Sequence, residues 1–169
     1  MFYPKDLTNP MYIATKSSKI DITLEKDTKS ISQKISDHLS KGDVVFLYGE
    51  IGVGKSTFIK HLINCLQSKS NQKKTEIPSP TFNIIYEYKI DKLVIQHYDL
   101  YRVKSELELK NIGIFENQKD SLILVEWPEI IKEKPKNIIE LNFNYEENLT
   151  KRSLVISSNY KKEIFNEFK

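Results

Sequence analysis

The octapeptide Gly49-Glu50-Ile51-Gly52-Val53-Gly54-Lys55-Ser56 matches the phosphate-binding pattern G-x-x-x-x-G-K-[ST] at every fixed position. Three of the five glycines of the chain fall within it. Glycine tolerates positive φ and lets the backbone approach a ligand closely, so these residues predict a loop whose N–H groups turn inward onto an anion. We expect the Lys55 ammonium to contact the β and γ phosphates of a nucleotide and the Ser56 hydroxyl to face magnesium.

The residues on both sides of this loop have the patterns that a phosphate-binding loop requires. Residues 44–48 form an unbroken apolar run, which is typical of a strand covered on both faces of a mostly parallel sheet. After the loop, apolar side chains recur at helical spacing and give one stripe: Ile59, Leu62, Ile63 and Leu66. The order of strand, loop and helix predicts an α/β fold of the P-loop NTPase class, in which helices flank a central mixed, mostly parallel sheet. The alternative is a glycine-rich turn that contains Lys-Ser by chance.

Length, charge and cysteine content limit the class of protein. The 169 residues predict a single domain, residues 1–169, with an irregular N-terminal lead at residues 1–18. The net charge is +3, and the 26 basic and 23 acidic residues are interspersed, which argues against a dedicated nucleic-acid surface. Cys65 has no partner for an internal disulfide, and no apolar run approaches the ~20 residues that cross a bilayer. We therefore expect a cytoplasmic protein without membrane contact, and one that needs a partner because it is too small for large accessory domains.

Apolar spacing and turn residues predict the other elements. Before the phosphate loop we expect an edge strand over residues 20–24 and a helix that Asp27 or Thr28 caps and Gly42 ends. After the helix that follows the loop, we expect an extended proline-containing loop over residues 77–81, a β-hairpin over residues 82–97 with its turn near Asp91-Lys92, and a short helix that Ser105 caps and Gly113 follows. The last predicted elements are strands over residues 121–125, 138–143 and 154–156 and an amphipathic segment around residues 164–168.

Acidic and hydroxyl side chains at the ends of these elements are candidates for catalysis. Glu126 follows a buried strand, where an acid holds magnesium or its water shell, although an ordinary strand-end glutamate is the alternative. Asp99 lies among apolar and aromatic residues, so it is either paired or functional. It would orient the attacking water or the metal shell, or form a salt bridge with Arg102, or cap a turn. Thr81 follows the Ser79-Pro80 loop and would sense the γ-phosphate, unless it is a plain loop threonine.

The three histidines, His38, His61 and His97, have no metal-ligand spacing, and we interpret them as structural or surface residues.

Together, four motifs resemble the TsaE family. They are Gly49-Glu50-Ile51-Gly52-Val53-Gly54-Lys55-Ser56-Thr57, Ser79-Pro80-Thr81-Phe82, His97-Tyr98-Asp99-Leu100-Tyr101-Arg102 and Leu124-Val125-Glu126-Trp127-Pro128, and the resemblance covers residues 20–157. It implies a magnesium-dependent ATPase that acts with the TsaB and TsaD proteins to form threonylcarbamoyladenosine at position 37 of tRNAs that read codons starting with adenine. The tRNA would be reached indirectly, through the complex.

The resemblance also implies roles for individual residues. The positions of Asp99, Glu126 and Thr81 in the sequence already make them the candidate catalytic residues. The resemblance assigns magnesium to Ser56 and Glu126 and a nucleotide-site role to Asp99. The residues it places at the nucleotide are Glu25, Thr28, Ile51, Gly52, Val53, Gly54, Lys55, Ser56, Thr57 and Arg152.

Three other functions compete with this interpretation. A small-molecule or nucleoside kinase shares the phosphate loop, but such kinases carry an arginine-rich lid, and this chain has only Arg102 and Arg152. A GTPase is disfavoured because the guanine-reading motif N-K-x-D is absent; residues 117–120 read Asn-Gln-Lys-Asp. A nucleotide-gated scaffold differs only in whether product formation needs hydrolysis or ATP binding alone.

Overall fold

The computed structural model of the chain describes residues 14–168. The predicted N-terminal lead at residues 1–18 lies mostly outside this range. Within it, Thr15–Lys16 form the short strand β1, which pairs with Ser157 and Ser158. Residues 15–16 are therefore part of the sheet, and the prediction of an irregular segment was wrong for them.

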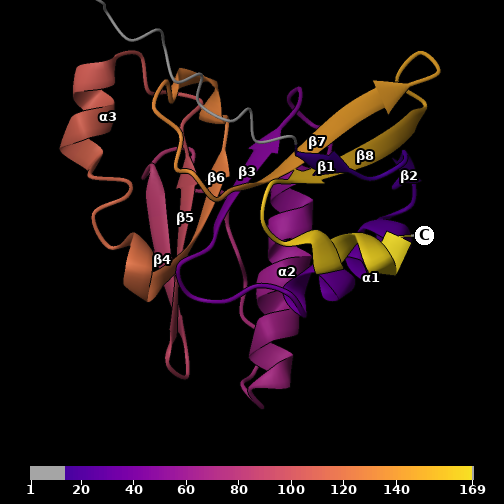
Figure 1. Cartoon of the computed structure of the whole chain (residues 1–169), viewed down its shortest axis with the longest axis horizontal. Helices are drawn as coiled ribbons and strands as arrows, with labels where there is room; N and C mark the ends of the chain where they lie inside the picture. Colours follow the sequence, from indigo (N-terminus) through magenta and orange to yellow (C-terminus); the bar gives the residue numbers. More distant parts are fainter. Residues whose placement is uncertain (1–13, 169) are drawn as a thin grey trace, which may run out of the picture.

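One mixed sheet of eight strands forms the centre of the fold (Figure 1). Its order is β1-β8-β7-β3-β6-β5-β4, and β2 (Ile20–Asp21) also pairs with β8 (Lys151–Ser158). Four inner strands run parallel: β7 (Ile139–Glu146), β3 (Val44–Tyr48), β6 (Ser121–Glu126) and β5 (Leu93–Asp99). By contrast, β4 (Ile85–Ile90) pairs antiparallel with β5, and the strands beyond β7 also pair in the antiparallel sense. The predicted central mixed sheet is confirmed.

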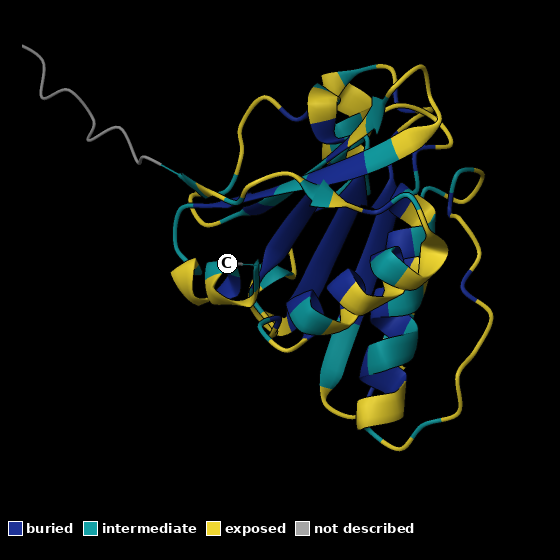
Figure 2. Cartoon of the chain, turned by 90° about the vertical axis from the view of Figure 1, so that its right-hand side faces the viewer, coloured by how far each residue is buried: buried dark blue, intermediate teal, exposed yellow. Residues whose placement is uncertain are grey.

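Helices cover both faces of this sheet, and alternate residues of the inner strands face them. Val45 and Leu47 pack with the helices α1 (Glu25–Ser36) and α2 (Lys55–Lys69). The intervening Val44 and Phe46 pack on the other face, towards α3 (Glu106–Ile112) and the loops around it. Figure 2 shows that the strands between these layers are buried. Because both faces of β3 are covered, its side chains need to be apolar on both faces, which accounts for the unbroken apolar run at residues 44–48.

The first helix differs from the prediction at both ends. It begins at Glu25 with Leu24 as N-cap. Thr28 lies inside the helix, and its hydroxyl donates to the Ile22 carbonyl at 3.3 Å. It ends at Ser36, well before Gly42. Gly42, with φ of +93°, instead lies in the loop before β3 and donates its N–H to the Ser121 carbonyl at 2.8 Å.

The hairpin also starts later than predicted. Ile84 has φ of +68° and its N–H donates to the Pro80 carbonyl, so the chain turns there and β4 begins only at Ile85. The predicted turn is confirmed, since Asp91 has positive φ and Ile90 pairs with Leu93.

The strands β7 and β8 extend further than their apolar residues indicated. Their pairing continues from Phe143 opposite Leu154 out to Glu146 opposite Lys151, through polar side chains. Backbone hydrogen bonds between neighbouring strands therefore lengthen both elements beyond the hydrophobic pattern.

The two remaining helical predictions are confirmed in position. Ser105 caps α3 by accepting the N–H of Glu108 at 3.2 Å, and Gly113 follows the helix in the left-handed conformation. The terminal segment is the 3-10 helix η3 (Lys162–Phe168), whose Ile164 is buried against the core around α1.

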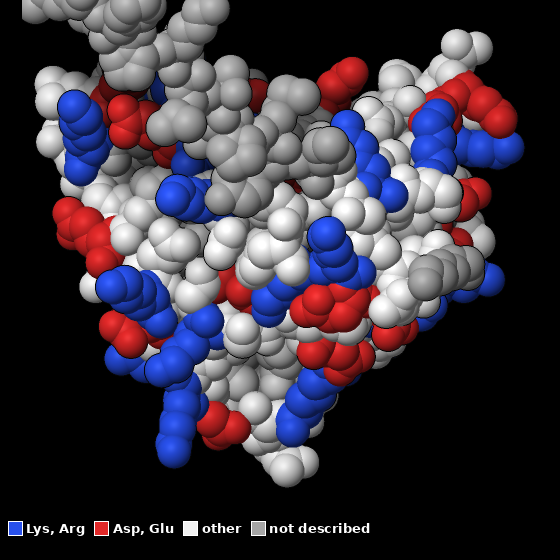
Figure 3. All heavy atoms as spheres, in the orientation of Figure 1, with Lys and Arg blue, Asp and Glu red and all other residues white. Residues whose placement is uncertain are grey.

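Two further features concern the surface charge and the length of the helices. On the face drawn in Figure 3, Lys and Arg side chains are interspersed with Asp and Glu. Within residues 14–168, every helix is too short or too polar to traverse a lipid bilayer.

Candidate functional site

The glycine-rich loop connects β3 to α2, and its backbone requires glycine. Gly49 has φ of +136°, and a Cβ there would lie 2.6 Å from the Phe143 carbonyl oxygen. Gly54, the N-cap of α2, has φ of +119°. Side chains at these positions would strain the loop or collide with the neighbouring strand. The predicted strand, loop and helix are thus present in the predicted order.

Lys55 is held inside this loop. Its ammonium donates to the carbonyl oxygens of Gly49 at 2.5 Å and Glu50 at 3.0 Å, and it lies 3.8 Å from the centre of the Trp127 ring. The residue is only 4% exposed. Burial lowers the pKa of Lys55, while the carboxylates of Glu126, Glu129 and Asp99 oppose that shift. A phosphate group beside this cation would replace the solvation that burial removes.

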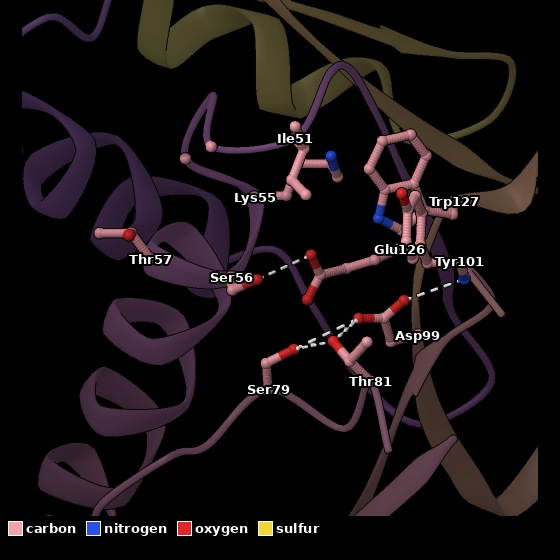
Figure 4. Close-up of a pocket in the computed structure, with 12 residues that line it drawn as sticks. Ile51, Lys55, Ser56, Thr57, Ser79, Thr81, Asp99, Tyr101, Glu126 and Trp127 are labelled. Carbon is pink, nitrogen blue, oxygen red and sulfur yellow. Dashed lines mark hydrogen bonds between the residues drawn. The ribbon is translucent and has the colours of Figure 1, made fainter. Parts of the chain in front are cut away.

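Ser56 and Glu126 form the second part of the site. Ser56 lies in the first turn of α2, and its hydroxyl donates to Glu126 Oε2 at 2.9 Å (Figure 4). Glu126 is the last residue of β6 and lies opposite Leu47 of β3. The pairing of these two strands thus places the acid beside the helix that follows the loop.

This donor pair suits magnesium. Hydroxyl and carboxylate oxygens are ligands that Mg²⁺ takes, and the ion usually keeps several waters and binds one or two protein groups together with phosphate oxygens. Within residues 14–168, no cluster of three or more His, Cys, Asp or Glu residues would hold a metal by protein ligands alone. The Ser56 and Glu126 oxygens fit an ion that takes its remaining ligands from phosphate and water.

Asp99 accepts hydrogen bonds from three sides. The hydroxyls of Thr81 and Ser79 donate to Oδ2 at 2.5 and 3.2 Å, and the Tyr101 N–H donates to Oδ1 at 3.0 Å (Figure 4). Asp99 is 3% exposed. Arg102 is not its partner: its guanidinium lies 4.4 Å from the centre of the Phe82 ring. The turn-cap alternative accounts for the Tyr101 contact, and the loop of residues 79–81 supplies the other two donors.

One pocket brings most of these side chains together. Its volume is about 220 Å³, and it lies at the carboxyl ends of β5 and β6, beside the phosphate loop. Its lining consists of Ile51, Gly52, Gly54, Lys55, Ser56, Thr57, Ser79, Thr81, Asp99, Tyr101, Glu126 and Trp127. Every predicted catalytic and metal residue is in this set.

Glu25, Thr28 and Arg152 lie elsewhere, in a hollow of about 170 Å³ that shares Gly52, Gly54 and Thr57 with the pocket. Buried Val53 also lines this hollow and not the pocket. Thr57 contributes to both spaces.

The predicted nucleotide residues therefore divide between two sides of the loop. Glu25 bonds His61 at 2.9 Å. The Arg152 guanidinium lies 5.6 Å from the centre of the Tyr145 ring, and its buried Nε has no hydrogen-bond partner within residues 14–168.

Sequence reasoning assigned no site role to three residues: His97 and Ser79, which lie beside the acids, and Trp127, which lies beside Lys55. His97, interpreted as structural or surface, is 1% exposed, and its Nε2 lies 2.9 Å from Glu126 Oε1. It precedes Asp99 by two residues on one strand, so the period of a strand indicates that both lie on the same face. Ser79 bonds Asp99, and Trp127 contacts Lys55 and lies 5.0 Å from the Tyr101 ring, centre to centre.

Comparison with known proteins identifies one family. The model of the family described as "Threonylcarbamoyl adenosine biosynthesis protein TsaE" matches residues 22–154. Three relatives are named tRNA threonylcarbamoyladenosine biosynthesis protein TsaE. The protein of Rickettsia conorii is 38% identical over 81% of this chain and 76% of its own length. The protein of Aquifex aeolicus is 36% identical over 68% of this chain and 78% of its own length. The protein of Haemophilus influenzae is 32% identical over 78% of this chain and 81% of its own length.

A solved structure shares the fold. YdiB of Bacillus subtilis superposes with a TM-score of 0.69 over 92% of this chain and 95% of its own, at 23% sequence identity. The arrangement of strands and helices described above is therefore one that an experimental structure also adopts.

Proposed function

The chain belongs to the TsaE family, and we propose that it is the magnesium-dependent ATPase required to form the threonylcarbamoyl group on adenosine 37 of tRNAs that read codons starting with adenine. The observation that carries the ATPase proposal is the hydrogen bond between Ser56 and Glu126 beside the Lys55 loop. It joins a phosphate-binding element to an acid that suits the accompanying metal ion.

In this proposal the protein acts in the cytoplasm with TsaB and TsaD, and it reaches tRNA indirectly through that complex. The relatives named above carry the pathway in their names. The interspersed charge on the face in Figure 3 gives no extended basic surface there for a direct RNA contact.

The chain's residues would divide the work of hydrolysis. The loop N–H groups and the Lys55 ammonium bind the phosphates and offset their charge. Ser56 and Glu126 hold magnesium, which when bound neutralises charge that develops on the phosphate oxygens. Asp99, whose position is set by Thr81 and Ser79, orients the attacking water, and Thr81 senses the γ-phosphate.

Among the residues that the structure describes, Lys55 is the only basic one in the lining of the pocket, beside Asp99 and Glu126. Many P-loop enzymes use an arginine, from the same chain or from a partner, to stabilise the charge of the transition state, and this arginine raises the turnover rate by about 10³-fold to 10⁵-fold. We therefore expect slow hydrolysis by the isolated protein and stimulation by TsaB and TsaD.

Reconstitution tests this function. The parent protein, TsaB, TsaD, tRNA, threonine, bicarbonate and ATP should give modified tRNA over many turnovers, and Lys55→Ala should abolish it. Loss of the charged hydrogen bonds of Lys55 should weaken magnesium-ATP binding by about tenfold to a hundredfold, measured by calorimetry, in a protein that still folds.

Two outcomes would favour the competing functions. If a non-hydrolysable ATP analogue sustains product formation equally, the protein is a nucleotide-gated scaffold. If tRNA modification is indifferent to the protein while phosphate is transferred to a small molecule, it is a kinase.

A further inference from the structure

A buried histidine holds the acid that the proposed function assigns to magnesium. His97 and Glu126 are 1% and 2% exposed, and His97 Nε2 lies 2.9 Å from Glu126 Oε1. The other carboxylate oxygen, Oε2, accepts the Ser56 hydroxyl at 2.9 Å. Both oxygens of Glu126 are therefore engaged, one towards β5 and one towards α2.

Strand register explains how the histidine reaches this acid. Glu126 of β6 lies opposite Asp99 of β5, and His97 is two residues earlier on β5, opposite Leu124. Side chains two residues apart share a face, and diagonal neighbours on adjacent strands lie within reach of long side chains. Glu126 thus has both His97 and Asp99 beside it, but its hydrogen bonds go to His97 and Ser56.

The direction of the hydrogen bond follows from the chemistry of the pair. In the proposed function Glu126 binds magnesium as a carboxylate, which only accepts hydrogen bonds, so this bond requires the proton on His97 Nε2. Nδ1 is buried and has no hydrogen-bond partner within residues 14–168. If the proton were on Nδ1 instead, Nδ1 would be a buried donor without a partner, and the bare Nε2 would face an acceptor oxygen of Glu126. The surroundings therefore favour the tautomer with the proton on Nε2.

We propose that His97 is a positioning residue for magnesium: its Nε2–H fixes Glu126 Oε1, so that Oε2 stays directed at Ser56, where the ion is held. This inference rests on the proposed function, in which Ser56 and Glu126 bind the ion. Hydrogen-bonding partners that orient metal ligands are worth about 10-fold to 100-fold in metal affinity. His97 therefore sets the magnesium requirement of the nucleotide site and has little part in holding the nucleotide itself.

A matched pair of substitutions tests the donor. His97→Leu removes it, whereas the side-chain amide of His97→Gln offers an N–H of comparable reach. ADP binding is measured by calorimetry in EDTA and at increasing magnesium. In EDTA, all three proteins should bind ADP with similar affinity, because the phosphate loop is untouched. The magnesium concentration that half-restores full affinity should rise about tenfold or more in His97→Leu, and much less in His97→Gln.

The outcomes separate this inference from the function on which it rests. If ADP binding by the parent is insensitive to magnesium, the magnesium part of the proposed function fails. If the parent requires magnesium and His97→Leu requires no more of it, or if His97→Gln is as impaired as His97→Leu, the positioning role of His97 is wrong and the proposed function stands.

The unaltered protein provides a test that does not depend on whether a variant folds. Nitrogen-15 NMR of the imidazole should show the proton of His97 on Nε2. A proton on Nδ1 with bare Nε2 would overturn the donor role.

Discussion

At the scale of single residues, the two acids of the pocket have separate sets of partners. Asp99 accepts from Thr81 and Ser79, which belong to a loop, whereas Glu126 is held by Ser56 of α2 and His97 of β5. A loop can rearrange between ligand states more readily than a helix or an inner strand can. Asp99 is therefore the acid whose surroundings we expect to respond to the γ-phosphate.

Both acids should matter more for turnover than for binding. We predict that, at saturating magnesium, Asp99→Asn and Glu126→Gln still bind ATP but release phosphate about 10²-fold to 10³-fold more slowly in the assembled complex, because fixed charges act mainly on the transition state. Binding is measured by calorimetry and turnover by phosphate release.

Glu129→Gln is a suitable control for these variants. It removes a nearby negative charge that also acts on Lys55, but Glu129 is exposed and does not line the pocket. Parent-like hydrolysis by Asp99→Asn or Glu126→Gln would show that the assigned role is wrong.

At the scale of elements, parallel pairing assembles the pocket. The strands β3, β6 and β5 are adjacent and parallel, so their carboxyl ends lie at the same edge of the sheet. The phosphate loop follows the first of them, and Glu126 and Asp99 end the other two. Ligands of open α/β sheets bind at this edge.

The loop is also fitted closely against β7, which gives a prediction for stability. In Gly49→Ala, the new Cβ would meet the Phe143 carbonyl oxygen at 2.6 Å, so the backbone of the loop or of β7 must move. In Gly42→Ala, φ is also positive, at +93°, but nothing lies within 4 Å of the new Cβ. Both substitutions strain the backbone because φ is positive at both positions, but only Gly49→Ala also causes a steric clash.

We therefore expect the free energy of unfolding to fall by about 1–3 kcal/mol more in Gly49→Ala than in Gly42→Ala. Urea denaturation of both variants measures the difference. Equal losses would mean that the loop and β7 are not in close contact.

At the scale of the whole molecule, the sheet separates two apolar layers, and Tyr98 belongs to the layer on the α3 side. Burial raises the pKa of Tyr98 to about 12, with smaller contributions from Glu87 and Glu116. In the unfolded chain the phenol titrates near pH 10. Between these values the unfolded state loses a proton that the folded state keeps, so the free energy of unfolding falls as pH rises.

Tyr98→Phe should remove this dependence. Within residues 14–168 its hydroxyl makes only one hydrogen bond, a long one of 3.5 Å to Gln96, so we expect little change in the free energy of unfolding at pH 8. Between pH 10 and 11.5 the parent should lose up to roughly 2 kcal/mol more than Tyr98→Phe. Urea denaturation across this pH range measures it, and parallel curves for the two proteins would contradict the buried phenol.

Local patterns within the sequence predicted several features. The phosphate loop is specified by eight consecutive residues, and the strand before it and the helix after it by the spacing of their own apolar side chains. The cap at Ser105 and the turn at Asp91 likewise depend on residues a few positions apart. Such features follow from the sequence because the interactions that make them lie within one element or one turn.

Tertiary structure determined the element ends and the partners of the acids. The full length of β7 depends on its pairing with β8, and the carbonyl of Ile84, where the chain turns, accepts the Asp99 N–H, so local spacing misplaced the end of β7 and the start of β4. His97 and Glu126 are 29 residues apart in the chain. They meet only because β5 and β6 pair in one register, and the sequence carries no local signal for which strands pair or where their side chains then converge.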